Sequence, residues 1–275
     1  MEQFPIGVFD SGIGGLTILR EFRTVLPEYD YLYLGDNARA PYGTRSFESV
    51  YKYTLECVEW LFQQGCKLVI LACNTASAKA LRNIQQNDLH RWPGHKVLGV
   101  LRPTTESIGN YTKSNHVGIL ATKGTVLSHS YPTEIKKFFP NITVHQEACP
   151  MWVPLVENRE HKSAGADYFV RQHIQQILNR DIQIDTLLLG CTHYPLLLPK
   201  IQVLVPSGVQ IVSQGLIVSH SLKDYLQRHS EIETGLTKQG NCKFYTTDSS
   251  QDFDELANLF FGESVASVHT AIQPN

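Results

Sequence analysis

The sequence of 275 residues lacks any strong excess of charge. Its 24 lysines and arginines nearly balance its 26 aspartates and glutamates, so the formal net charge is -2. A chain without a basic excess has no bulk electric field that would attract nucleic acid or an anionic membrane. We therefore expect a small polar substrate, and neither nucleic acid nor a membrane as a partner.

Long hydrophobic runs are also absent. The longest apolar stretches, such as 68–73 and 186–189, fall far short of the roughly 20 residues that cross a bilayer. Residues 1–5 contain an acid and a proline, where a secretion signal would carry basic residues followed by an apolar region. The sequence therefore predicts a cytoplasmic protein.

The chain also has no Cys-x-x-Cys pair and no Cys/His pair at zinc-site spacing. A chain of this length in a reducing compartment has little use for disulfides, so we expect free thiols. There is no Gly-Lys-Ser/Thr phosphate loop, and Thr17 stands where a dinucleotide fingerprint would have its third glycine. The sequence thus predicts neither of these nucleotide-binding sites.

Short apolar segments alternate with amphipathic ones along the whole chain, which is typical of βα units and of an α/β fold with parallel sheets. We expect strands at 6–9, 31–34, 67–72, 96–100, 116–120, 142–145, 186–189, 209–212 and 242–247. We expect helices at 16–25, 47–62, 76–86, 132–139, 164–178 and 215–228, with another beginning near 195.

A weak internal repeat relates the two halves of the chain. The segment IGVFDSG at 6–12 resembles VGILATK at 117–123, and VILACNT at 69–75 resembles LLLGCTH at 187–193. Such self-similarity indicates duplicated structural units. It makes Cys73 and Cys191 equivalent, each at the carboxyl end of a predicted strand, where open α/β sheets bind ligands.

Either cysteine alone could be a buried core residue, but their duplication favours one shared active site. Each is followed by polar residues, Asn74-Thr75 in one case and Thr192-His193 in the other. Such neighbours, together with helix-start amides, can lower a thiol pKa from its usual value of about 8.5.

The segment DSGIGG at 10–15 follows a strand and opens a helix, so its glycines and amides can approach an anion, best a carboxylate. Asp10 is either a helix cap or a group that binds a substrate ammonium or orients a thiol. His193 is likewise either a capping histidine or the base that keeps Cys191 ionised. The PYG segment at 41–43 alone could be a plain surface turn.

Four segments together resemble the aspartate/glutamate racemase family, and within it the glutamate racemases. They are IGVFDSGIGGLT at 6–17, APYG at 40–43, LACNTAS at 71–77 and LGCTHYPLL at 189–197, and the similarity covers essentially the whole chain. GCTHYP discriminates best, because aspartate racemases are more similar to Gly-Cys-Thr-Glu at that point.

The resemblance implies two similar α/β domains, each a mainly parallel sheet flanked by helices, related by pseudo-two-fold symmetry with the active site between them. We assign residues 1–98 and 210–275 to the first domain, with Cys73, and 99–209 to the second, with Cys191. The resemblance also implies that no metal or PLP is used, and a homodimer is expected.

The implied activity is cofactor-independent racemisation of L-glutamate and D-glutamate, which supplies D-glutamate for peptidoglycan and hence for cell shape. Inversion of a stereocentre needs an acid and a base on opposite faces of the carbanion. We expect Cys73 to act on D-glutamate with help from Asp10, and Cys191 to act on L-glutamate with help from His193. Glu157 matches a further acidic position near the second cysteine.

The resemblance also implies a set of residues that line the substrate: Asp10, Ser11, Pro41, Tyr42, Gly43, Asn74, Thr75, Thr192 and His193. The chain departs from the usual family pattern at 101–104 (LRPT) and at 213–215 (SQG), where a hinge between the domains is expected. The short N-terminus lacks the extension of members activated by a cell-wall precursor, so no such activator is expected.

The sequence leaves three other functions open. A racemase of the same family could act on aspartate or on another small acidic amino acid. A two-domain binding protein would hold an amino acid without exchanging its α-proton. Binding to a topoisomerase would be an interaction role, and the near-neutral charge does not favour it.

Overall fold

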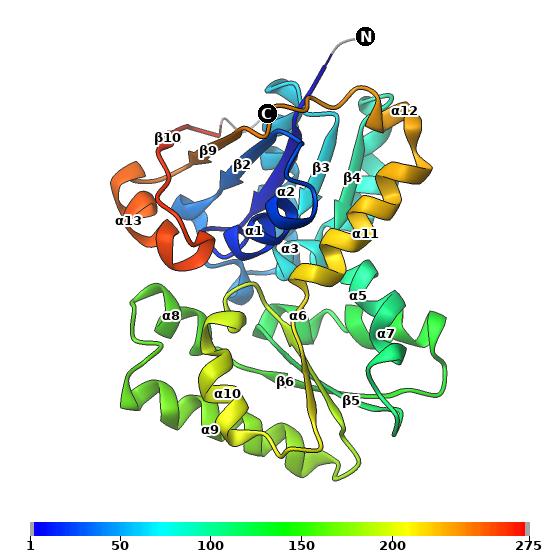
Figure 1. Cartoon of the computed structure of the whole chain (residues 1–275), viewed down its shortest axis with the longest axis vertical. Helices are drawn as coiled ribbons and strands as arrows, with labels where there is room; N and C mark the ends of the chain where they lie inside the picture. Colours follow the sequence, from blue (N-terminus) through cyan, green and yellow to red (C-terminus); the bar gives the residue numbers. More distant parts are fainter. Residues whose placement is uncertain (1–2, 273–275) are drawn as a thin grey trace.

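The protein, described by a computed structural model over residues 3–272, folds into two α/β domains stacked on each other (Figure 1). Each domain is built around one parallel β-sheet. The predicted α/β class with two mainly parallel sheets is therefore confirmed.

The first sheet has six strands in the order β10-β9-β2-β1-β3-β4, and all its neighbouring strands run parallel. Its central strands are buried along their whole length, because helices cover both faces of the sheet, and this explains their continuous apolar sequences. The strands are β1 (Ile6–Asp10), β2 (Tyr31–Gly35), β3 (Leu68–Leu71), β4 (Lys96–Gly99), β9 (Cys242–Thr246) and β10 (Ser267–His269).

The second sheet has four parallel strands in the order β6-β5-β7-β8. They are β5 (His116–Ala121), β6 (Thr143–Ala148), β7 (Thr186–Gly190) and β8 (Gln210–Val212). Since Gln210–Val212 pairs with β7, the predicted return of the chain to the first domain at residue 210 comes too early. The chain leaves the second sheet only after Val212.

The internal repeat corresponds to a repeat in topology. The order β2-β1-β3-β4 in the first sheet matches β6-β5-β7-β8 in the second. The register matches as well, since Gly7 lies opposite Val69 and its counterpart Gly118 lies opposite Leu187. The residues that follow β3 and β7 therefore occupy equivalent places in the two sheets.

In the described part of the chain, seven α-helices belong to the first domain. They are α1 (Leu16–Val25), α2 (Phe47–Gln63), α3 (Asn74–Lys79), α4 (Leu81–Asn83), α11 (Gly215–Arg228), α12 (Ser230–Glu233) and α13 (Ser250–Phe261). The helix predicted at 76–86 begins two residues earlier, with Cys73 as its N-cap, and is interrupted at Ala80. A π-helical turn at Ile84–Asp88 follows it.

The second domain carries α6 (Lys123–Leu127), α7 (Ser130–Phe138), α8 (Trp152–Glu157), α9 (Ala164–Arg180) and α10 (Leu198–Leu204), while α5 (Leu101–Ser107) follows β4 where the chain crosses between domains. The predictions omitted α5, α6, α8, α12, α13 and β10. In α5 and α8 a proline occupies the third helical position, Pro103 or Pro154. The amides of the first turn have no intrahelical partner, so a proline there does not break the helix.

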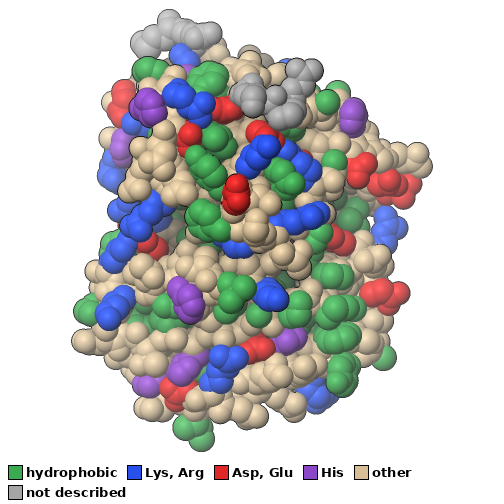
Figure 2. Space-filling model, turned by 180° about the vertical axis from the view of Figure 1, so that it is seen from behind, with side chains coloured by type: hydrophobic (Ala, Val, Ile, Leu, Met, Phe, Trp, Pro, Cys, Tyr) green, Lys and Arg blue, Asp and Glu red, His purple; other side chains and the backbone are tan. Residues whose placement is uncertain are grey.

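The surface matches the balanced composition. On the face seen in Figure 2, acidic and basic side chains are interspersed, without one dominant sign. No helix within residues 3–272 combines the length and the apolar character needed to cross a membrane.

Candidate active site

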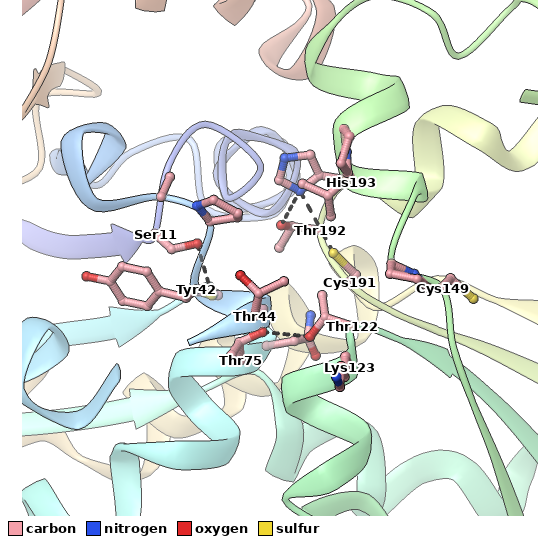
Figure 3. A pocket seen from close by; sticks show the side chains of 18 of the residues that line it. Ser11, Tyr42, Thr44, Thr75, Thr122, Lys123, Cys149, Cys191, Thr192 and His193 are labelled. Atoms are coloured by element: carbon pink, nitrogen blue, oxygen red, sulfur yellow. Dashed lines mark hydrogen bonds between the residues drawn. The ribbon is translucent and has the colours of Figure 1, made fainter. Parts of the chain in front are cut away.

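A pocket lies between the two domains, where the carboxyl ends of β1 and β3 face those of β5 and β7 (Figure 3). Ser11 and Tyr42 lie on one side of it, and Cys191, Thr192 and His193 on the other. All the predicted site residues except Asp10 line this pocket: Ser11, Pro41, Tyr42, Gly43, Cys73, Asn74, Thr75, Glu157, Cys191, Thr192 and His193.

Cys73 and Cys191 line this one pocket from opposite domains. Each lies just after the equivalent strand of its own sheet, β3 or β7, and each is only 6% exposed. Acid/base groups that must reach opposite faces of one carbon need such a placement. The repeat in the fold therefore brings two thiols to a single enclosed site.

The Cys73 thiol is held at the start of α3. Its sulfur accepts a hydrogen bond from the Ala76 amide at 3.4 Å and donates one to Ser11 Oγ at 3.4 Å. Burial, followed by the charge of Asp10, raises the pKa of the Cys73 thiol to about 12, although Ser11 and the Ala76 amide oppose this. Cys73 is therefore a protonated thiol at neutral pH.

The surroundings of Cys191 are different, because an imidazole lies beside it. Nδ1 of His193 is 3.9 Å from the Cys191 sulfur, and Nε2 of the same ring is 2.9 Å from Oε1 of Glu157. Burial opposes protonation of His193, but its contacts with Cys191 and Glu157 outweigh burial and raise its pKa to about 10. A positive charge thus lies next to the second sulfur at neutral pH.

Asp10 is buried and is not among the residues that line the pocket, although its neighbour Ser11 is. Its Oδ2 accepts a hydrogen bond from the Gly12 amide at 3.0 Å, and its buried Oδ1 has no partner among residues 3–272. Burial raises the pKa of Asp10, against the opposing effects of His193 and of the amides of Gly12 and Gly15.

The loop at 40–44 forms one wall of the pocket and begins with a cis peptide bond between Ala40 and Pro41. The Tyr42 hydroxyl donates a hydrogen bond to Asp36. Oδ2 of Asp36 also accepts from Arg39 Nε at 2.7 Å. This buried carboxylate therefore fixes the position of the Tyr42 ring.

The two domains approach each other closely at glycines beside the pocket. A Cβ atom at Gly14 would lie 2.3 Å from Thr192 Oγ1 and 2.4 Å from the His193 ring. A Cβ atom at Gly43 would lie 2.9 Å from Thr122 Cβ. Only glycine permits such a close approach between backbone and side chain, so these two residues allow the domains to close around the pocket.

Polar groups from both domains supply hydrogen-bond donors to the pocket. Oγ1 of Thr75 lies 2.9 Å from Oγ1 of Thr122 in the other domain. Oδ1 of Asn74 accepts a hydrogen bond from Tyr131, while Asn74 Nδ2 is buried without a partner among the described residues. An unpaired buried donor at a pocket wall is suited to a ligand acceptor such as a carboxylate.

Eight further residues, which the sequence analysis does not identify as site residues, also line the pocket. The repeat held a signal for one of them, because Thr122 is the counterpart of Ser11. Cys149 follows β6 directly, at the same edge of the sheet. The eight are Ala40, Thr44, Thr122, Lys123, Cys149, Pro150, Val153 and Pro154. Among residues 3–272, the group of potential metal ligands, His116, His145 and Asp181, lies outside the pocket.

The fold and the pocket define a class: a two-domain α/β enzyme whose equivalent cysteines, Cys73 and Cys191, come from opposite domains to a shared interdomain site. The sequence profile of the Asp/Glu/hydantoin racemase family matches residues 16–217, and the chain belongs to this family. It is a racemase. The predicted family is thereby confirmed.

Individual relatives are similar over nearly their whole length. Glutamate racemase 2 of Caldanaerobacter subterraneus subsp. tengcongensis is 37% identical over 268 residues, which cover 98% of this chain and 97% of the relative. The glutamate racemase isoform RacE1 from Bacillus anthracis has 35% identity and a TM-score of 0.89, with 99% of each chain covered. The Francisella tularensis glutamate racemase, solved in complex with D-glutamate, has 30% identity and a TM-score of 0.86, again with 99% of each chain covered.

Proposed function

We propose that this racemase interconverts L-glutamate and D-glutamate without a cofactor, using Cys73 and Cys191 as a pair of opposed acid/base groups. The observation that carries the proposal is the presence of both thiols in one pocket, from opposite domains and from equivalent strand ends. The relatives that are similar over nearly their whole length bear the name glutamate racemase.

In the proposed reaction, Cys191 begins as a thiolate beside the protonated His193 and removes the α-proton of L-glutamate. The resulting carbanion takes a proton on its opposite face from the Cys73 thiol, and D-glutamate forms. The sulfur of Cys191 is then protonated and that of Cys73 is a thiolate. This is the state that accepts D-glutamate, so the same steps run in reverse for that enantiomer.

The protonation states in the pocket support this assignment of roles. The pKa of Cys73, raised to about 12, keeps this thiol protonated, as an acid must be. The pKa of His193, raised to about 10, places a positive charge next to the sulfur that acts as the base. Asp10 adds to this asymmetry, because its charge favours the protonated form of Cys73.

A carbanion next to a carboxylate needs an enclosed site with fixed dipoles, because no cofactor delocalises its charge in this scheme. The substrate is proposed to contact Ser11, the loop residues Pro41, Tyr42 and Gly43, and the polar groups of Asn74, Thr75, Thr192 and His193. The unpartnered amide nitrogen of Asn74 supports a substrate carboxylate near α3.

The proposed physiological role is the supply of D-glutamate for peptidoglycan, and hence for cell shape, in the cytoplasm. We further propose that the enzyme is a homodimer, which sedimentation equilibrium or light scattering of the purified protein would test. Residues 1–98 together with those after Val212 are proposed to form one domain, and 99–212 the other.

Racemisation followed by circular dichroism, starting from each enantiomer of glutamate and of aspartate, tests the proposed substrate. The wild type is expected to racemise glutamate from both directions and to prefer it over aspartate. Cys73→Ala and Cys191→Ala are each expected to lose racemisation, while Cys242→Ala, a change outside the pocket, keeps it. Faster turnover of aspartate, or saturable glutamate binding with no turnover, would overturn the proposal.

A further inference from the structure

A series of buried hydrogen bonds connects the segment where the polypeptide passes between the domains to the pocket. Gln214 lies between β8 of the second sheet and α11, where the polypeptide returns to the first domain. Its Nε2 donates to Tyr131 Oη at 2.8 Å and to Thr104 Oγ1 at 2.9 Å, and it also lies 3.4 Å from the Val100 carbonyl. The Tyr131 hydroxyl then donates to Asn74 Oδ1 at 2.6 Å.

The direction of each hydrogen bond in this series follows from the groups involved. Thr104 donates its own proton to the Val100 carbonyl at 3.0 Å, so its oxygen is the acceptor for Gln214. The side-chain nitrogen of Gln214 is only a donor, so Tyr131 must accept from it and use its single proton elsewhere. That proton goes to Asn74, so the Asn74 oxygen faces Tyr131.

This arrangement leaves the Asn74 amide nitrogen without a partner among residues 3–272, although it is buried at the pocket wall beside Cys73. Its two N–H groups need an acceptor, and a bound substrate carboxylate supplies one. These hydrogen bonds connect the two domains, since Asn74 begins α3 of the first and Tyr131 belongs to α7 of the second. The orientation of the Asn74 amide therefore depends on how the two domains are arranged.

We infer that Tyr131 and Gln214 are positioning residues that hold the Asn74 amide with its N–H groups toward the substrate. The inference rests on the proposed racemisation of glutamate. Neither residue lines the pocket, so each acts through Asn74.

Tyr131→Phe keeps the ring and removes only the hydroxyl. We expect the KM for glutamate to rise about tenfold, the usual scale for a lost hydrogen bond to a charged group, while kcat changes much less. Gln214→Glu is expected to act in the same direction, because a carboxylate accepts the Tyr131 proton and draws it away from Asn74. The matched control is Tyr29→Phe, which loses a hydroxyl contact with Glu233 outside the pocket.

The double variant Asn74→Ala/Tyr131→Phe separates positioning from general loss of structure. With the amide gone, loss of the Tyr131 hydroxyl should leave KM as it is in Asn74→Ala alone. An unchanged KM in Tyr131→Phe, or an equal rise of KM in both backgrounds, overturns the inference. Absence of glutamate racemisation by the wild type would instead count against the proposed function itself.

A second, independent observation concerns the outer end of the second sheet. His116 begins β5, His145 lies on the neighbouring β6, and Asp181 follows α9. Oδ2 of Asp181 is 2.6 Å from Nδ1 of His116 and 3.0 Å from Nε2 of His145. The three ligand atoms lie within 4.8 Å of one another, and their side chains are 16 to 24% exposed.

We propose that these three side chains bind a divalent ion of the zinc class, remote from the catalytic pocket. Two imidazoles and one carboxylate suit Zn²⁺ and its neighbours in the transition series, whereas Mg²⁺ and Ca²⁺ prefer oxygen ligands throughout. A bound ion would join the end of α9 to β5 and β6, and would raise the stability of the folded state by mass action.

Zinc titration of the full chain by calorimetry tests this site in a Cys73→Ser/Cys149→Ser/Cys191→Ser background, which removes the three pocket thiols as ligands. We expect one zinc ion to bind, with a rise in Tm, and no response to Mg²⁺. Further replacement of His116 and His145 by Ala should weaken this binding at least tenfold, whereas His220→Ala at an exposed position should not. Undiminished binding in the double histidine variant overturns the proposal.

Discussion

Oε1 of Glu157 lies 2.9 Å from Nε2 of His193, on the ring atom opposite the one that faces Cys191. The imidazole is therefore held between a carboxylate and a sulfur. Within the described part of the chain, the Cys73 thiol has no such imidazole partner and contacts only a hydroxyl and a backbone amide. The two halves of the pocket share a fold but differ in charge, and this difference leads to the predictions below.

Glu157→Gln should lower the pKa of His193, because it replaces the carboxylate that stabilises the protonated ring. We expect kcat from L-glutamate to fall about tenfold, and the alkaline limb of its pH profile to move to lower pH. Initial rates from both enantiomers between pH 7 and 10 measure this effect. Glu160→Gln, a neighbouring change at an exposed position, is the control, and an unmoved alkaline limb in Glu157→Gln would contradict the assignment.

Stability should fall as pH rises from about 6.5 toward 10. The pKa of His193 is raised from 6.5 to about 10, so over this range the folded state holds a proton that the unfolded state has lost. The stabilisation is complete below 6.5 and disappears as pH passes the folded-state pKa. Urea unfolding at pH 6 and pH 9 should show a smaller loss for His193→Asn than for the wild type, and equal losses would contradict this prediction.

Gly14→Ala should disrupt the contact between the domains, because the new Cβ would lie 2.3 Å from Thr192 Oγ1. Displacement of Thr192 and His193 by about an ångström should lower kcat/KM about a hundredfold. Gly208→Ala is the matched control, since a Cβ there meets no atom of residues 3–272 within 4 Å. If both variants keep full kcat/KM in the racemisation assay, the close approach at Gly14 has no role in the site.

Much of this arrangement could be predicted because it follows from local sequence. The apolar runs at β1, β3, β5 and β7 and their repeat identified the strands, and the two cysteines stand at the ends of two of them. The matching registers of Gly7 with Val69 and of Gly118 with Leu187 explain why so weak a repeat was informative.

The remainder depends on contacts between distant segments that no local pattern encodes. Tyr131 and Asn74 are 57 positions apart, and nothing near either residue predicts that they meet. The family resemblance predicts that both Asp10 and Ser11 contact the substrate, but a local pattern does not indicate that Ser11 lines the pocket while Asp10 is buried beside it. The predicted return to the first domain at residue 210 is too early, because the apolar pattern of 210–212 predicts a strand but does not indicate which sheet this strand joins.

Exchange of the α-proton in D₂O by single cysteine variants tests the two-thiol account most directly. Cys73→Ala keeps only the sulfur that faces L-glutamate, so it should incorporate deuterium into L-glutamate without forming D-glutamate. Cys191→Ala should do the reverse, exchanging D-glutamate alone. Mass spectrometry of the separated enantiomers gives the result, and full racemisation by either variant would contradict the account.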